Sequence, residues 1–317
     1  MTTPPLLTAL TAKARTTTHP HHTPCACGTA TITTLADRPD ATVVRHADTV
    51  AKAHAPGTDR AHLTARLTTA SHLPGILLPP LTEIPLTLHG RLVTLWPYGT
   101  PVDPDDPDAA PWEAAATLLA HLHRAPAPTI PLPPMRGPEK AARALARLTA
   151  AAAPHPATPT ILRAWSDLPA WARAEAPMPD TATLCHGDLH LGQLVRADGT
   201  PQSPWRLIDV DDLGVGVPAW DLARPAAWYA CGLLPPDEWT RFLEAYRAAG
   251  GPAVPADGDP WPALDVPARA LTVQSAAQAV TKALSAARPL DEVEQSLVDA
   301  CARMAATPPE LARNFAK

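Results

Sequence analysis

The sequence predicts an α+β fold with two lobes: a small amino-terminal lobe built on an antiparallel sheet and a larger, mainly helical carboxy-terminal lobe. Three observations support this prediction. Short β-prone segments joined by turns recur between residues 29 and 96. Helical patterns rich in Ala, Leu and Arg dominate from residue 112 onward, and a polar loop between short apolar runs interrupts them near residue 188. We therefore expect lobes at residues 1–98 and 99–317.

Bulk properties narrow the class of partner. The 317 residues can bury a sizeable core, and the net charge of −5 suits a cationic or neutral small molecule better than a nucleic acid. No apolar run approaches the ~20 residues needed to span a bilayer, and the first twenty residues lack the features of a signal peptide. The five cysteines are scattered, which favours a reducing cytoplasm over a disulfide framework. These properties do not decide between a monomer and a homodimer.

The amino-terminal segment is rich in Thr and Pro and carries possible metal-ligand side chains. These are His19, His21, His22, Cys25 and Cys27. One interpretation is a metal site, and the other is a floppy leader over residues 1–22 that runs into the first strand. The Cys-x-Cys spacing lacks the usual gap of two to four residues, which favours the leader.

The pattern then turns to strands and one helix. Segments rich in β-branched residues predict strands at 29–35, 41–45, 49–54, 75–81, 85–88 and 91–96. Between the third and fourth of these, Thr58 can cap a helix that has Asp59 in its first turn. We expect this helix to stop before Pro74.

Helices dominate the remainder of the chain. Apolar spacing and helix-end residues predict helices at 112–124, 139–153, 160–174, 237–249, 263–288 and 291–306. A Pro-dense connector at 126–134 follows the first of them. The second and third form a helical insert ahead of the polar loop.

The polar loop carries the most informative chemistry in the chain. A short apolar run leads into His186-Gly187-Asp188-Leu189-His190, an amide follows at Gln193, and a later apolar run ends at Asp209. One carboxylate can orient or deprotonate a hydroxyl, while an amide and a second carboxylate can hold Mg²⁺ on the phosphates of a nucleotide. This order of groups suits phosphoryl transfer.

The string from His186 to Gln193, followed by Leu207-Ile208-Asp209, resembles the aminoglycoside phosphotransferase family, kinases of small molecules with a protein-kinase-like fold. That family usually has Asn where this chain has Gln193, and the Gln is typical of its maltokinase-like branch. The resemblance implies that Asp188 is the catalytic base or the group that positions the acceptor hydroxyl. It also implies that His186 helps to set the shape of the loop and that His190 hydrogen-bonds either Asp188 or a phosphate. It also implies that Gln193 and Asp209 are the ligands of Mg²⁺.

The resemblance also implies a site for ATP in the amino-terminal lobe. Lys52 matches the lysine that contacts the α- and β-phosphates, and Trp96 and Tyr98 fall in the hinge that meets the adenine. Two departures stand out. The turn at 35–42 has no glycine fingerprint, and no Glu follows on the next helix to pair with Lys52. Asp59 is the carboxylate available there, so it is the candidate partner of Lys52.

Two further acidic features follow from the same resemblance. Asp221 is expected to cap a helix or to brace the catalytic loop. Asp257, Asp259 and Asp265 provide either an acidic rim for a cationic acceptor or a solvated loop.

The implied activity is an ATP- and Mg²⁺-dependent transfer of the γ-phosphate to a hydroxyl of a small molecule. An aminoglycoside or other antibiotic is the first expected acceptor, which would mean a role in antibiotic resistance. The alternatives are a sugar kinase, maltokinase-like or acting on an amino sugar, and a nucleotide-binding pseudokinase. The sequence does not choose between ATP and GTP.

Overall fold

The computed structural model describes residues 4–19, 32–126, 130–151, 153–179, 182–197, 200 and 202–306. The described chain divides into two compact units. The first unit runs to Ala110 and also contains residues 130–133 and Leu191–Asp211, while the second contains the remainder. The division therefore differs from the expected boundary between 98 and 99. The segment that carries Gln193 and Asp209 packs with the amino-terminal strands. A single boundary in the sequence cannot describe this division, because the first unit contains separate segments of the chain.

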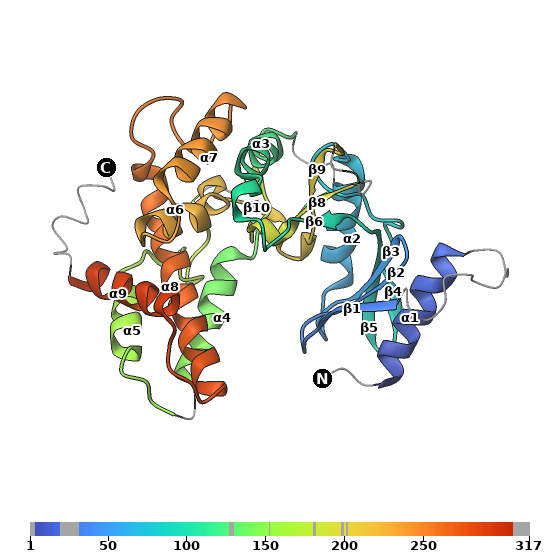
Figure 1. Cartoon of the computed structure of the whole chain (residues 1–317), viewed down its shortest axis with the longest axis horizontal. Helices are drawn as coiled ribbons and strands as arrows, with labels where there is room; N and C mark the ends of the chain where they lie inside the picture. The colour runs from blue at the N-terminus through green and yellow to red at the C-terminus, as the bar shows by residue number, and fades with distance from the viewer. Residues whose placement is uncertain are drawn as a thin grey trace. The chain divides into compact units, whose positions relative to one another are not determined.

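The first unit is built on a five-stranded antiparallel sheet with the order β1-β2-β3-β5-β4 (Figure 1). Its strands are β1 (Ile32–Asp37), β2 (Thr42–His46), β3 (Thr49–Ala53), β4 (Leu86–Leu88) and β5 (Arg91–Pro97). Helix α2 (Arg60–His72) connects β3 to β4 and carries Asp59 as its N-cap. The predicted strand at 75–81 is wrong: within that range a single bridge forms, between Leu77 and Leu207.

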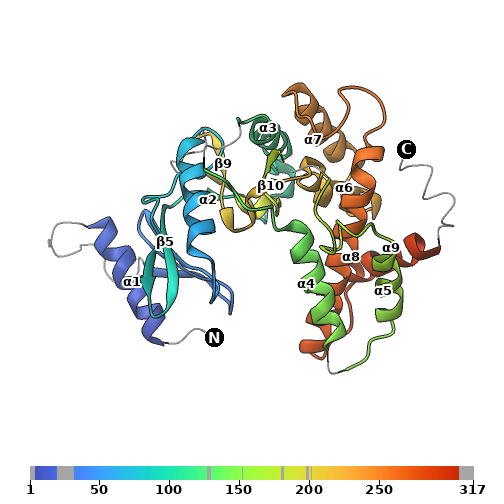
Figure 2. The same ribbon diagram turned by 180° about the vertical axis from the view of Figure 1, so that it is seen from behind.

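Helix α1 (Pro4–Thr18) covers one face of this sheet (Figures 1 and 2). Leu6, Leu10 and Ala14 recur every four residues, so they share one side of the helix. They are buried against sheet residues that include Val44 and Ala51. The predicted floppy leader is therefore wrong over this helix, because three small or branched apolar side chains suffice to dock it. The predicted metal ligands from His21 to Cys27 lie outside the described residues.

Strand alternation gives the opposite face of the sheet a different character. Ala51 and Ala53 of β3 face α1, so Val50 and Lys52 point to the other side. A second, three-stranded sheet lies on that side of the first. The residues just before and just after the hairpin of this second sheet lie near Lys52. The second sheet has the order β6-β8-β9, from β6 (Thr100–Pro101), β8 (Leu194–Arg196) and β9 (Trp205–Leu207).

The second unit is helical. Its helices are α3 (Trp112–His123), α4 (Gly137–Thr149), α5 (Thr158–Ser166), α6 (Ala223–Ala230), α7 (Pro236–Ala248), α8 (Trp261–Ser285) and α9 (Glu292–Ala306). Helix α8 packs beside α4 and α9 (Figure 2), and α3 packs on α7. Helices α4, α5, α8 and α9 pack around a shared hydrophobic core, whose buried residues include Leu145, Ile161 and Val280.

One small antiparallel pair holds the polar loop of the second unit. Strand β7 (Thr183–Cys185) pairs with β10 (Gly214–Gly216), so Cys185 lies opposite Gly214. The loop that begins at His186 leaves from the end of this pair. Its exit from a paired strand fixes where the loop starts.

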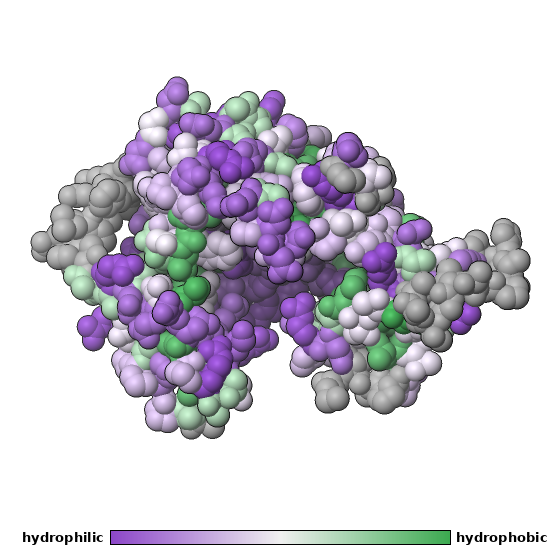
Figure 3. All heavy atoms as spheres, in the orientation of Figure 1, coloured by the Kyte–Doolittle hydropathy of each residue, from purple (hydrophilic) through white to green (hydrophobic). Residues whose placement is uncertain are grey.

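The predicted fold class is confirmed: a small antiparallel-sheet unit and a mainly helical unit. The predicted helix at 160–174 is shorter in the structure, ending at Ser166 ahead of Pro169. On the face drawn in Figure 3, apolar residues form small patches among hydrophilic ones. Across the described residues, no helix is long and apolar enough to cross a membrane.

Candidate active site

The first unit contains a pocket of about 390 Å³, lined by side chains from both of its sheets. The predicted hinge residues Trp96 and Tyr98 line this pocket together with Lys52, Gln193 and Asp209. The Trp96 indole donates to Thr94 Oγ1 at 2.8 Å. The Arg45 guanidinium lies 3.3 Å from the centre of the Tyr98 ring. Both aromatic rings are therefore held in place, and the wall they form suits a planar heterocycle.

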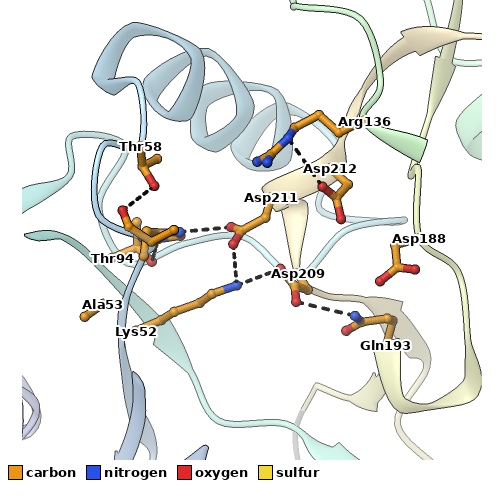
Figure 4. Close-up of polar contacts among 12 residues, drawn as sticks. Lys52, Ala53, Thr58, Thr94, Arg136, Asp188, Gln193, Asp209, Asp211 and Asp212 are labelled. Carbon is orange, nitrogen blue, oxygen red and sulfur yellow. Dashed lines mark hydrogen bonds and ion pairs between the residues drawn. The ribbon is translucent and has the colours of Figure 1, made fainter. Parts of the chain in front are cut away.

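Lys52 lies between two carboxylates at one end of the pocket (Figure 4). Its ammonium is 2.7 Å from Asp209 Oδ1 and 3.0 Å from Asp211 Oδ2. Burial alone would lower the pKa of Lys52, but the charges of Asp209 and Asp211 outweigh it and raise that pKa. The lysine is therefore a fixed positive charge at neutral pH, as a phosphate ligand requires.

Asp211 supplies the carboxylate that the helix lacks. Burial would raise its pKa, but Lys52 and then His54 hold the pKa well below the usual range. His54 Nδ1 lies 3.0 Å from Asp211 Oδ1, and its Nε2 is 2.8 Å from Thr94 Oγ1. The predicted pairing of Asp59 with Lys52 is wrong. Asp59 accepts from the backbone N–H of His62 and caps α2, with its side chain more than half exposed.

Hairpin register brings Gln193 and Asp209 together. Leu194 pairs with Leu207 across β8 and β9. Gln193 comes just before Leu194 and Asp209 comes two residues after Leu207, so the two side chains lie close together. The backbone N–H of Ile208 donates to the Gln193 carbonyl at 2.9 Å. The Gln193 side-chain amide donates to Asp209 Oδ2 at 3.4 Å. Asp209 has φ of 63°, a conformation that costs energy in most residues and recurs at functional sites.

The donor set at this end of the pocket fits a magnesium ion. Magnesium prefers hard oxygen ligands and is often held by one or two carboxylates plus the phosphates of a nucleotide. Asp209 and Asp211 offer carboxylate oxygens in the pocket. A flip of the Gln193 side-chain amide would present its oxygen instead of its nitrogen to the same point. The Lys52 ammonium already shows that this point attracts a cation.

Asp221 braces the polar loop of the second unit. Its two side-chain oxygens accept from the backbone N–H groups of His186 at 2.6 Å and Gly187 at 2.7 Å. His123 Nε2 lies 3.0 Å from Asp221 Oδ2 and His123 Nδ1 lies 2.7 Å from the Tyr246 hydroxyl. Burial raises the pKa of Tyr246, which keeps its O–H available as a donor to His123. The predicted bracing role of Asp221 is confirmed.

Gly187 is needed at its position in the loop. It has φ of 85°, and an added Cβ would lie 2.4 Å from the Asp212 carbonyl oxygen. A side chain there is excluded by backbone rather than by a flexible group that could move aside. The loop therefore crosses the segment at Asp212 in close contact.

Asp188, the predicted catalytic residue, is held by two cations of the same unit. Lys140 of α4 hydrogen-bonds Asp188 Oδ2, and Arg224 of α6 donates to Asp188 Oδ1 at 2.9 Å. Lys140 also donates to Asp212 Oδ2 at 2.8 Å. Burial would raise the pKa of Asp188, but Lys140 and Arg224 lower it. The carboxylate is thus kept ionised and oriented.

Sequence reasoning missed Lys140 and Arg224. Lys140 was one basic residue in a predicted insert helix, 48 positions before Asp188. The backbone N–H of Arg136 donates to the Asp212 carbonyl at 3.2 Å, which anchors the start of α4 beside the loop. Lys140 then lies one helical turn further along. No local signal in the sequence indicates this contact.

The two loop histidines have different surroundings. His186 is fully buried, and its backbone N–H binds Asp221, which agrees with a role in shaping the loop. Burial lowers the pKa of His190 to about 4, so its imidazole is neutral at neutral pH. In the described chain, His190 makes no hydrogen bond to Asp188, so the predicted hydrogen bond between these two residues is wrong. Lys140 and Arg224 take those oxygens instead.

Two of the three carboxylates of the candidate acidic rim, Asp259 and Asp265, make local contacts. Asp259 accepts from the backbone N–H of Trp261 at the start of α8. Asp265 lies 3.6 Å from Arg269, one turn along the same helix.

Comparison with known proteins gives one family and one fold. The model of the phosphotransferase enzyme family matches residues 34–265. The comparison with curated proteins found no match.

Several solved structures share the fold over nearly the whole chain. A choline/ethanolamine kinase family protein from Mesorhizobium loti is 17% identical with a TM-score of 0.61, and the match covers 98% of each chain. A microcompartment-associated aminopropanol kinase is 17% identical with a TM-score of 0.58, over 96% of this chain and 98% of that one. A spectinomycin phosphotransferase in complex with ADP and spectinomycin is 15% identical with a TM-score of 0.54, over 90% and 92%.

Proposed function

Since the chain belongs to the phosphotransferase enzyme family, we propose that it transfers the γ-phosphate of ATP, with Mg²⁺, to a hydroxyl group of a small molecule. Phosphotransfer to an alcohol group of a small molecule follows from membership of the family. The nucleotide, the metal and the role of each residue are the proposal.

One observation carries it: Lys52, Gln193, Asp209 and Asp211 meet at one end of a pocket whose other wall is aromatic. In the proposal the wall at Trp96 and Tyr98 receives the adenine. Lys52 contacts the phosphates, while Gln193 and Asp209 hold Mg²⁺. Bound Mg²⁺ would offset the charge that builds up on the β- and γ-phosphates during transfer.

Asp188 has the task of presenting the acceptor hydroxyl. Its lowered pKa makes it a weak base, so its main contribution is orientation of the hydroxyl toward the γ-phosphate. As the new O–P bond forms, the bond between the γ-phosphorus and the β,γ-bridging oxygen breaks and ADP leaves, while the proton of the hydroxyl passes to an Asp188 oxygen. Arg224 and Lys140 hold the carboxylate for this task, and Asp221 holds the loop through His186 and Gly187.

One of the two sequence features that favoured a pseudokinase carries less weight in this structure. The pseudokinase alternative rested on the missing glycine loop and on the missing helix Glu. Lys52 has two carboxylate partners without that Glu, because Asp211 pairs with it. The pocket is also lined by Leu35, from the turn region that lacks glycine. The sequence resemblance predicts an aminoglycoside or other antibiotic as the acceptor, with a sugar as the alternative, and the family match does not choose between them.

The test is a coupled ADP-release assay with Mg-ATP over a panel of sugars, amino alcohols and antibiotics, with product phosphorylation read by mass spectrometry. We expect acceptor-stimulated turnover that stops when EDTA removes the metal. GTP in place of ATP reports the choice of nucleotide. Calorimetry that shows Mg-ATP binding without turnover on any acceptor would support the pseudokinase instead.

A further inference from the structure

The surroundings of Asp188 are rich in positive charge. Helix α4 carries Arg136 at its N-cap and Lys140, Arg143 and Arg147 along its length. The spacings of three, four and seven residues place these side chains on one side of the helix. We call this side the basic face of α4.

A different side of α4 is apolar and packs into the core, so the basic face is not the side that the core covers. Ala144, Leu145 and Leu148 are buried in the core shared with α5, α8 and α9. Lys140 reaches Asp188 and Asp212, so the basic face begins at the catalytic carboxylate. At about 1.5 Å per residue, Arg143 and Arg147 lie about 5 Å and about 10 Å further along the axis than Lys140.

Carboxylates near the start of this face are already neutralised. Both oxygens of Asp188 bind cations, and Lys140 takes one oxygen of Asp212. Arg136 lies 3.7 Å from the other oxygen of Asp212 and 3.7 Å from the exposed Glu139 (Figure 4 shows the first pair). An ammonium group of an acceptor would therefore have to displace Lys140 or Arg224 to bind Asp188.

Positive charge is in excess further along the face. Among the residues that the structure describes, Arg143 and Arg147 form neither an ion pair nor a hydrogen bond through their side chains. Desolvation and then the positive charge of Arg136 lower the pKa of Arg143, and the charges of Asp212 and Glu139 offset only part of this effect. A bound anion would relieve this repulsion.

We infer that the acceptor carries an anionic group, a carboxylate or a phosphate, that the basic face of α4 binds through Arg143 and Arg147 while the hydroxyl meets Asp188. The inference rests on the proposed phosphotransfer at Asp188. The anionic group would be separated from the reacting hydroxyl by about 5–10 Å, the offset of these arginines along the helix. A polycationic aminoglycoside is disfavoured, because it would approach five cations: Arg136, Lys140, Arg143, Arg147 and Arg224.

The test uses one sugar skeleton with different charges. Glucuronate, glucose 6-phosphate, glucose and glucosamine are titrated into the full chain by calorimetry. We expect the two anions to bind at least ~10-fold more tightly than glucosamine, the usual scale of a charge-assisted contact. The Arg143→Glu variant should lose this preference. The carboxylate and phosphate arms distinguish the two kinds of anion.

Two controls keep the result specific. Arg163→Glu changes an exposed arginine of α5 that also lacks a side-chain partner in the described chain, and it should leave the preference intact. Lys52→Met should leave glucuronate binding unchanged, which separates the basic face from the phosphate end of the nucleotide pocket. Glucosamine binding as tightly as the anions, anion binding unaffected by Arg143→Glu, or no anion binding at all would overturn the inference.

The same samples separate this inference from the proposed function. Failure to bind Mg-ATP would contradict the proposed function, while anion binding at Arg143 would still be measured. Mg-ATP-dependent turnover on glucosamine or another cationic acceptor, unaffected by Arg143→Glu, would uphold the proposed function and overturn the inference.

Discussion

Each unit of the molecule contains a cluster of paired carboxylates and cations, and the two clusters differ in which charge is in excess. In the first unit one lysine, Lys52, is shared between Asp209 and Asp211. In the second unit one aspartate, Asp188, is shared between Lys140 and Arg224. The first cluster has carboxylate to spare for a metal ion. The second has positive charge to spare, so it favours an acceptor that brings negative charge.

The larger of two effects that would sharpen this comparison is expected at Asp211. We predict that Asp211→Asn lowers kcat/KM for Mg-ATP about 10-fold or more, because a buried lysine loses one of its two charged partners. Lys52 would then bind Asp209 alone and compete more strongly with the metal. Steady-state kinetics with varied Mg²⁺ measures this, and added Mg²⁺ should restore part of the loss.

Asp59→Ala is the matched control for that variant, since it removes the carboxylate that the sequence predicts as the partner of Lys52. It deletes only the cap of α2, so it should lower the melting temperature slightly and leave kcat/KM unchanged. Equal kinetic losses in the two variants would contradict the assignment of Asp211 as the partner.

A smaller effect is expected at Lys140. Lys140 lowers the pKa of Asp188, so the ionised, active form persists as the pH falls through the ordinary aspartate range. Lys140→Met removes that charge and raises the pKa of Asp188. We predict that the acid limb of the kcat/KM profile moves to higher pH by about one unit.

Lys140→Arg keeps the positive charge and should return the acid limb toward its original position. A pH profile that is the same in the Met variant as in the unchanged chain would show that Lys140 has no electrostatic effect on Asp188. A purely structural role would change kcat without moving the limb.

Much of the fold could be predicted from local pattern. Strands β1 to β3 and helices α3, α7 and α9 follow from β-branched runs, helical apolar spacing and capping residues, which act over a few positions. Helix α1 is not among the predicted helices, because the Thr and Pro residues of its sequence favour irregular structure over helix. Packing of Leu6 and Leu10 on the sheet supplies what local preference does not.

The candidate site divides along the same line. Asp188, Gln193 and Asp209 are positioned by short segments close to them in sequence, so their order predicts their chemistry. The contact of Lys52 with Asp211 and that of Lys140 with Asp188 join residues far apart in the chain. They depend on sheet order and on the start of α4, which the sequence pattern does not encode locally.

The most direct test is a paired measurement on Asp188→Ala: Mg-ATP affinity by calorimetry and acceptor-dependent turnover by ADP release. Because the proposal assigns Asp188 to the acceptor and nucleotide binding to the pocket of the other unit, affinity should stay within about 2-fold while turnover falls by about 10³-fold or more. Full turnover in this variant, or loss of Mg-ATP binding together with turnover, would contradict the account.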